Sequence, residues 1–499
     1  MSAGRRIWRG ALLATVMRIG VAVITFGFFA VLARHWGVER LGEFSSAFAV
    51  FVMLQQVSLL GLHFVLIRDV AKSPERAREL VSNLVIIGLV IAVVLAVAVT
   101  TVSRLVYPTT LHLSMLLVGV ALVPSVFTTT GEALLIAQER LDTVARITVT
   151  ESLLRTLLWL TMLAADLGVA SLIVALLLCR VATGWVYWSR AEGLSHQFDR
   201  AAVNAQVLRM LIKASPPFFG ILLLSAGVSR LDFLMLSAIA GPIALGLYSA
   251  PYRIVEGLLL IPQAVTVALF PYIARECALA PDDRRQYSLA EPQFAFLATA
   301  IRASLVLGLP AAIALATLSP WIVPLLFGGA FSDASVVLVI LALMPIPVAI
   351  DQILGSLLLA NHRQRADLLV MCACAGFYMV ALAVLIPLYG YAGAAVATLL
   401  TSLVQLFVRY AAVMRTLRVG GLLALAGRPI VAAGVSATVA ALLHARPFLA
   451  TVTSLMAFGV CVVFLQVVQP HEFRALRRIG LARFNRAAPS EVRPAVEPE

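Results

Sequence analysis

The sequence predicts an all-α integral membrane protein, with about fourteen transmembrane helices arranged as two copies of a six-helix unit followed by two more helices. Three observations support this fold class. The chain of 499 residues is 61% apolar with a mean hydropathy of +0.99, whereas soluble globular domains are about one half apolar. Long apolar windows follow one another along the chain. Residue patterns of the first half also recur in the second half at a nearly constant offset.

Fourteen windows are long and apolar enough to cross a bilayer, which takes about 20 residues of helix. They lie at residues 12–33, 44–67, 80–103, 111–136, 144–165, 169–189, 215–240, 245–272, 295–318, 333–359, 366–387, 392–414, 428–444 and 449–469. The thirteenth is the weakest, because Gly434, Ser436 and Thr438 dilute it. The basic residues 1–10 lead into an apolar run without a small-residue cleavage site, so we expect an uncleaved first helix.

The basic residues fall on alternate sides of these windows very unevenly. If the N-terminus is cytoplasmic, 28 lysines and arginines lie on the inner side and only Arg34, Arg40, Arg104 and Arg446 lie on the outer side. Such a bias is the usual sign of membrane orientation, with positive charge inside. Orientation therefore accounts for the net charge of +13, and we predict cytoplasmic termini and no nucleic-acid partner.

The repeated patterns indicate an internal duplication. One set recurs at an offset of 204, where Leu41, Gly42, Phe44, Ser45 and Phe48 correspond to Leu245, Gly246, Tyr248, Ser249 and Tyr252. Further sets recur at 222 to 223, including Leu134, Leu135, Ala137 and Arg140 as Leu357, Leu358, Ala360 and Arg363. One insertion of about twenty residues, near 278–292, accounts for the change of offset, and duplicated architecture is usual among secondary transporters.

The duplication predicts the domain boundaries. We expect an N-terminal six-helix lobe at 1–205, a C-terminal six-helix lobe at 206–418, and a helix pair without counterpart at 419–470. Residues 471–499 begin as a basic amphipathic segment suited to the inner leaflet and end as a polar tail that we expect to be disordered.

Charged residues inside two windows mark the stretch from Ser215 to Arg275. Arg230 and Asp232 lie within the first window and Arg253 and Glu256 within the second, where an ionisable group costs roughly 2.5 to 3.5 kcal/mol. Arg253 and Glu256 are three residues apart and can pair on one helix face, but Arg230 and Asp232 are two apart and cannot. At least one of the latter therefore needs a partner from another helix, or a ligand.

Other windows carry charge too. Glu151 and Arg155 are four residues apart and can pair, Glu132 lies in the fourth window, and Arg18 lies in the first. For all of these, structural packing and a functional role are both open. Arg180 and Arg409 are expected to snorkel or to lie near an interface.

Prolines also fall at matching positions of the two halves. Pro124 lies in the fourth window and Pro347, beside Pro345, in the tenth. Interrupted spans at corresponding positions indicate a midplane site or a hinge, although a tolerated packing kink is the alternative.

Catalytic motifs do not emerge from the sequence. We find no P-loop, GxSxG or HExxH pattern, the seven histidines and five cysteines lack ligand spacing, and the loops are too short for a catalytic domain. We therefore predict no enzyme activity, no cofactor and no metal. Guanidinium groups in a low-dielectric cavity would suit a phosphate or carboxylate.

Several segments together resemble a known family. They are ARHWGVERLGEFSSAFAVFVMLQQVSLLGLHFVLIRDVA, SRLDFLML, GLYSAPYRIVEGLLLIPQAVTVALFPYIAR, LLFGGAFSDASVVLVILAL, LGSLLLANHRQR and IPLYGYAGAAVATLLTSLVQ. In this order, over about Arg18 to Arg418, they resemble bacterial polysaccharide (O-antigen or oligosaccharide) flippases of the multidrug/oligosaccharidyl-lipid/polysaccharide exporter superfamily. The characteristic motifs of the lipid II flippase branch are not found, nor is the acidic cation site that multidrug exporters carry in the first helix.

The resemblance implies lobes that face a central cavity and rock between inward and outward openings in a bacterial inner membrane. It implies a cargo of undecaprenyl-diphosphate-linked oligosaccharide for cell-surface polysaccharide, with a polymerase or other synthesis machinery as a further partner. Arg18, Arg230 and Arg253 are the residues we assign to anion contact. Glu132, Glu151, Arg155, Asp232 and Glu256 are assigned to coupling or charge balance.

Two other functions stay open on sequence alone. One is an ion-coupled exporter of drugs or other small molecules on the same fold, and the other is a non-transporting membrane anchor for a synthesis complex. For a flippase, the membrane potential could drive transfer without ion coupling, and proton coupling through Glu132, Glu151 or Asp232 is equally open.

Overall fold

The computed structural model describes residues 3–190, 203–278, 291–361, 363–417, 424–443 and 446–465. Side chains are described from Gly20 onward, except those of 217, 221, 225–226, 261–278, 291–296, 416–417 and 424–425. The described chain is helical, as predicted, and no strand occurs in it.

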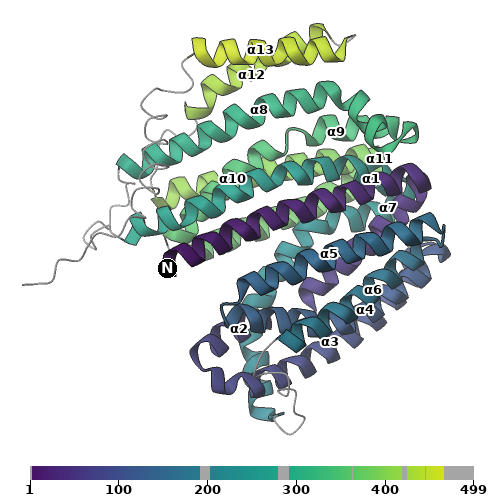
Figure 1. The fold of residues 1–499 in the computed structure, drawn as a ribbon. Coiled ribbons are helices and arrows are strands. Elements are labelled where there is room, and N and C mark those ends of the chain that lie inside the picture. Colours follow the sequence, from purple (N-terminus) through teal and green to yellow (C-terminus); the bar gives the residue numbers. More distant parts are fainter. Residues whose placement is uncertain are drawn as a thin grey trace, which may run out of the picture. The chain divides into compact units, whose positions relative to one another are not determined.

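The first half is built from six helices, most of them long (Figure 1). They are α1 (Ala3–Val57), α2 (Leu62–Lys72), α3 (Ala77–Val106), α4 (Thr109–Ala137), α5 (Leu141–Ala164) and α6 (Val169–Arg190). Helices α3 and α6 both pack on α4, while α5 packs on α6 and on α1. The second predicted window, 44–67, is not one helix, because the chain breaks between Val57 and Leu62 with Gly61 at a φ of 75°.

The second half begins with the longest helix, α7 (Ala205–Ala278), and continues with α8 (Glu291–Phe327), α9 (Ser335–Leu341), α10 (Pro345–Ala360) and α11 (Gln364–Leu417). The predicted interruption of the tenth window is confirmed, since α9 ends at Leu341 and α10 starts at Pro345. Helix α4 continues through Pro124, so this interruption is not shared by the two halves. Two shorter helices, α12 (Ala424–Leu442) and α13 (Pro447–Phe464), follow.

Three of the long helices are broken at a glycine into two limbs. Gly37 in α1 has φ 77° and ψ −169°, and Gly241 in α7 has φ 82° and ψ −179°. This backbone region is open essentially to glycine alone. The two glycines are 204 residues apart, so the break itself is duplicated, and α11 has a further break at Gly390.

Ten helices in the described residues are long and apolar enough to span a membrane. Because α1, α7 and α11 each consist of two limbs, this number is consistent with the fourteen predicted windows. The protein is therefore a multi-pass membrane protein.

Contacts divide the chain into two compact units, which differ from the predicted domains. One unit contains 1–281 and 318–416, and the other contains 282–317 and 417–499. In the second unit α12 packs on α13, the Ser436 hydroxyl donates to the Ser454 carbonyl at 2.6 Å, and the hydroxyls of Thr317 and Thr451 lie 2.8 Å apart. The division into lobes at 205 and 418 stays a prediction.

In the first unit, the backbones of α1 and α7 come into close contact at two glycines. A Cβ atom on Gly42 would lie 1.8 Å from the carbonyl oxygen of Pro242, and one on Gly246 would lie 2.1 Å from that of Val38. Gly42 and Gly246 are 204 residues apart, as are Val38 and Pro242. The same backbone contact is thus made twice, once by each copy, and neither place has room for a side chain.

Serines fill the remaining space at this crossing. The Ser45 hydroxyl donates to that of Ser249, the equivalent residue of the second copy, at 3.1 Å. The hydroxyls of Ser46 and Ser237 also contact each other, and all four side chains are buried. The duplicated segments identified in the sequence therefore lie face to face.

Beside this crossing, the break at Gly37 is tied to the turn between α5 and α6. Arg40 and the Trp36 indole each donate to Asp166 at 2.7 Å. These hydrogen bonds, that from Arg40 above all, hold the pKa of this exposed carboxyl below its usual range.

Candidate substrate-binding site

Two arginines share one carboxylate where the limbs of α7 lie side by side. Arg230 donates to Glu256 Oε1 at 2.8 Å, and Arg253 donates to Glu256 Oε2 at 2.7 Å. Arg230 comes from the first limb and the other two from the second, so the contact joins the limbs. Two guanidinium groups against one carboxylate leave a net charge of +1 on this triad.

Aromatic rings support both arginines. The Arg253 guanidinium lies 4.0 Å from the centroid of the Phe29 ring of α1, and that of Arg230 lies 5.3 Å from that of Phe233. An arginine on a ring face gains cation–π attraction. The Nε atom of Arg253 is buried and has no hydrogen-bond partner, so this N–H group remains able to donate to an anion.

Asp232 belongs to a separate, fully buried polar cluster. Its carboxylate accepts the Tyr248 hydroxyl at 2.6 Å and the backbone N–H of Phe233 at 2.9 Å. The Thr398 hydroxyl of α11 lies 3.1 Å from that of Tyr248 and 2.9 Å from that of Tyr378. The prediction that Arg230 and Asp232 do not pair is confirmed, because each finds its partner elsewhere.

The first half has its own buried ion pair. Glu151 and Arg155 of α5 pair at 2.5 Å, as their spacing predicts, and Arg155 lies over Trp159 at 5.1 Å. Glu132 lies half-buried in α4, within electrostatic range of Arg180 of α6. Arg18 falls within α1, but its side chain lies outside the described residues.

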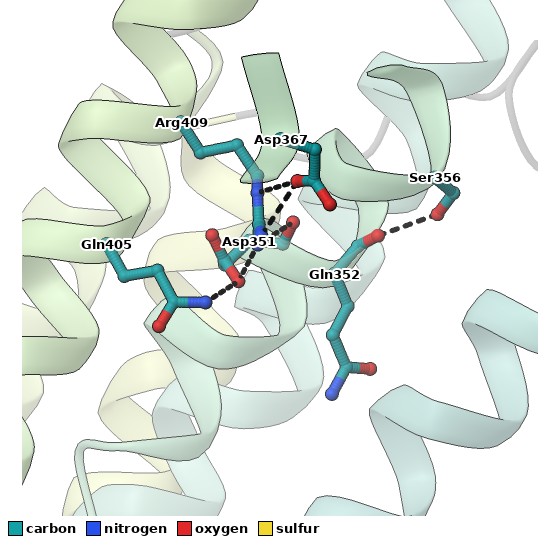
Figure 2. A network of polar contacts seen from close by, with 6 residues as sticks. All are labelled: Asp351, Gln352, Ser356, Asp367, Gln405 and Arg409. Atoms are coloured by element: carbon teal, nitrogen blue, oxygen red, sulfur yellow. Dashed lines mark hydrogen bonds and ion pairs between the residues drawn. The ribbon is translucent and has the colours of Figure 1, made fainter. Parts of the chain in front are cut away.

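Arg409 is buried and paired, so it does not snorkel, while the alternative that it lies near an interface stays a prediction. Only 6% of this residue is exposed, and its guanidinium lies between two carboxylates, those of Asp351 in α10 and Asp367 at the start of α11 (Figure 2). Gln405, one turn before Arg409, donates to Asp351 at 2.8 Å. The available signal was an aspartate inside an apolar window, which requires a cation nearby.

The Arg180 side chain does not snorkel, and not all of its hydrogen-bond donors have partners. Its guanidinium lies over the ring of Phe51 in α1 at 5.5 Å, and its Nε atom is buried without a hydrogen-bond partner. Among the described residues, no three His, Cys, Asp or Glu side chains are grouped so that they could hold a metal ion.

The fold is similar to that of several solved transporters, two of which are described as members of the multidrug/oligosaccharidyl-lipid/polysaccharide superfamily. The lipid II flippase MurJ in an inward closed conformation is similar with a TM-score of 0.71 at 13% identity, covering 91% of this chain and 99% of that chain. An inward-facing multidrug resistance transporter of the MATE family is similar with a TM-score of 0.61 at 15% identity, covering 80% of this chain and 94% of that chain. A transporter of the same superfamily from Pyrococcus furiosus, described as having a binding pocket of reverse polarity, has a TM-score of 0.55 at 14% identity. The match covers 82% of this chain and 94% of that chain.

The sequence itself identifies the family. Residues 31–336 match the family of polysaccharide biosynthesis proteins, and the chain belongs to it. The resemblance found in the sequence is thereby confirmed. None of the curated proteins compared with the chain matches it.

Proposed function

We propose that the protein is a flippase that moves undecaprenyl-diphosphate-linked oligosaccharide from the cytoplasmic to the outer leaflet of a bacterial inner membrane, for cell-surface polysaccharide. Membership of the polysaccharide biosynthesis family supports the pathway. The observation that carries the proposal is the triad of Arg230, Arg253 and Glu256, whose net charge is positive inside an apolar helix pair.

A diphosphate is a suitable ligand for this triad. Guanidinium groups bind phosphate oxygens through paired, charge-assisted hydrogen bonds. Glu256 is the most exposed member, with 30% of its side chain accessible against 15% for Arg230 and 8% for Arg253. An arriving diphosphate can compete with this carboxylate for both arginines, so Glu256 occupies the anion position while the cargo is absent. Arg18 is the third arginine that we propose for anion contact.

The remaining charged residues serve charge balance in this proposal. Glu151 and Arg155 neutralise each other, and Asp232 and Glu132 are retained as candidates for coupling. Moving one elementary charge across 100 mV is worth about 2.3 kcal/mol. An inside-negative potential would therefore favour export of a diphosphate's two charges by about 4 to 5 kcal/mol if the arginines stay in place.

The crossing of α1 and α7 is the outer gate in this proposal. The positive-inside bias puts Gly37 and Gly241 on the outer side with both termini cytoplasmic. The glycine contacts then close the outer end, and they must separate for the cargo to leave. A polysaccharide polymerase is the natural partner to receive the exported cargo.

The test is flipping in reconstituted vesicles that contain a short sugar on undecaprenyl diphosphate. An enzyme added outside modifies only outward-facing sugar, so flipping raises the modified fraction beyond one leaflet. We expect this rise with the wild-type protein, and a rate at least about tenfold lower with Arg230→Ala, which removes a charge-assisted contact worth about 1.5 to 3 kcal/mol.

The matched control is Arg104→Ala, at the exposed end of α3, which should flip at the wild-type rate. Folded wild-type protein that gives no rise contradicts the proposal. Transport of a small organic molecule by that same preparation would favour the exporter instead, and neither activity would favour a non-transporting anchor. Equal rates for Arg230→Ala and wild type would remove the triad from the site.

A further inference from the structure

The buried cluster of α10 and α11 is separate from the triad and carries unbalanced charge (Figure 2). Asp351 and Asp367 contribute two carboxylates, and Arg409 contributes one guanidinium. Arg409 Nε donates to Asp367 Oδ1 at 3.0 Å, while its Nη1 donates to Asp351 Oδ2. If both aspartates are ionised, the cluster has a net charge of −1 inside the packed protein, where uncompensated charge is costly.

One atom of this cluster is left without a partner. Asp351 is 5% exposed, its Oδ2 atom accepts from Arg409 and from Gln405, but its Oδ1 atom is buried and accepts no hydrogen bond. A buried carboxylate oxygen without a partner retains its full desolvation penalty. The cluster therefore lacks one positive charge, and the Asp351 Oδ1 atom lacks one hydrogen-bond donor.

We propose that Asp351 Oδ1 is a proton-binding site. Uptake of one proton turns this carboxylate into a neutral carboxylic acid, leaves Arg409 paired with Asp367, and brings the cluster from −1 to zero. A proton needs only one oxygen, whereas a metal cation needs several and would lie close to the Arg409 guanidinium. The site can take up its proton from the side of Asp367, whose side chain is 14% exposed.

The surroundings support this charge balance. Helix α10 carries no other charged residue, and Cys374 of α11 is the neighbouring thiol within electrostatic range. Helix α7 also packs on α10. Its charged side chains have other partners or face outward: Arg230 and Arg253 are paired with Glu256, and Asp232 accepts a hydrogen bond from Tyr248. Arg209 and Lys213 are exposed. The guanidinium itself lies flat against Gly355, where a Cβ atom would be 3.4 Å from its central carbon.

Proton occupancy then controls how α10 is held. With Asp351 ionised, Arg409 joins α10 to both limbs of α11, because Asp367 lies before the break at Gly390 and Arg409 after it. With Asp351 protonated, the ion pair to α10 is lost while the pair within α11 remains. Binding of a proton is thus linked to the packing of α10, independently of what the protein transports.

The test uses infrared difference spectroscopy of the full-length protein in lipid vesicles as the pH is lowered from about 8 to about 5. The wild type should gain the carbonyl stretch of a buried carboxylic acid that Asp351→Asn does not gain; any band from Asp232 or Glu132 would be common to both. Asp367→Asn should also lose the band over this range, although it retains Asp351, because its cluster is already neutral. The exposed Asp333→Asn is the matched control and should retain the band.

Two conservative variants identify the carboxyl group that takes the proton. The band should change its frequency with Asp351→Glu and keep it with Asp367→Glu; the opposite result overturns the proposal, as does an unchanged band in Asp351→Asn. These glutamates keep the charges, so they carry the test even if an asparagine variant fails to fold. Loss of the band on replacing choline chloride with sodium chloride would indicate a metal cation instead. Since no cargo is present, the result stands or falls separately from the flipping assay.

Discussion

Gly42→Ala is the sharpest perturbation of the crossing between α1 and α7. The new Cβ atom would lie 1.8 Å from the Pro242 carbonyl oxygen, while ordinary contact begins at 3.4 Å, so the two helices must move about 1.6 Å apart there. The obstacle is backbone and cannot rotate away. Overpacking of this kind costs about 1 to 3 kcal/mol.

That cost falls only on the state in which the crossing is closed. If the crossing opens during transport, destabilising the closed state by 1 to 3 kcal/mol shifts the equilibrium toward the open state by about 5- to 150-fold. Gly246→Ala should act in the same way, because its Cβ atom would lie 2.1 Å from the Val38 carbonyl oxygen. The shared mechanism follows from the duplicated contact.

Oxidative cross-linking measures this shift. Ser45→Cys combined with Ser249→Cys, in a background without the native cysteines, places two thiols where hydroxyls now lie 3.1 Å apart. We expect Gly42→Ala to slow disulfide formation at least about fivefold. Gly27→Ala, in the same helix with nothing within 4 Å of its Cβ position, should leave the rate unchanged. Equal rates for Gly42→Ala and Gly27→Ala would refute the reasoning.

Three further outcomes are expected. Arg409→Gln leaves two buried carboxylates without their cation and should lower the free energy of unfolding by about 3 to 5 kcal/mol; a wild-type melting temperature would contradict the ion pairs seen here. Trp159→Ala should cost about 3 to 5 kcal/mol in the same thermal measurement, because the indole is fully buried and donates to the Leu172 carbonyl at 2.8 Å. Glu256→Gln raises the triad's charge from +1 to +2, so inorganic pyrophosphate should raise its melting temperature more than that of the wild type, and the difference should shrink in high salt.

The spans and the short-range ion pairs could be predicted from sequence because each is encoded locally, and the duplication because its two copies can be compared within one chain. An apolar window specifies its own helix, and residues three or four apart on a helix must share a face, which is why Glu151 with Arg155 and Arg253 with Glu256 are found paired. The ion pair between Arg230 and Glu256 could be predicted only in part. The spacing showed that Asp232 could not be the partner, but not which residue was.

The partners of Arg409 could not be predicted, since Asp351 and Asp367 lie 58 and 42 residues before it in the chain. Snorkelling is a rule about a single helix, and it fails where a neighbouring helix supplies a carboxylate. The close contacts of Gly42 and Gly246 could not be predicted from the sequence either. A repeat identifies equivalent residues, but nothing in one sequence says that equivalent residues touch each other.

That contact has the form of an isologous interface, in which the same patch on two subunits meets itself. Val38 meets Gly246 as Pro242 meets Gly42, so a single lobe carries both sides of the contact needed to form a two-fold homodimer. Once two lobes are fused into one chain, the amino-acid sequence of each copy can change independently of the other. At the offset of 204, Arg230, Asp232, Arg253 and Glu256 correspond to Phe26, Phe28, Ala49 and Val52. The charged residues therefore occur in one copy only, and a symmetric dimer would have had to carry either all of them twice or none.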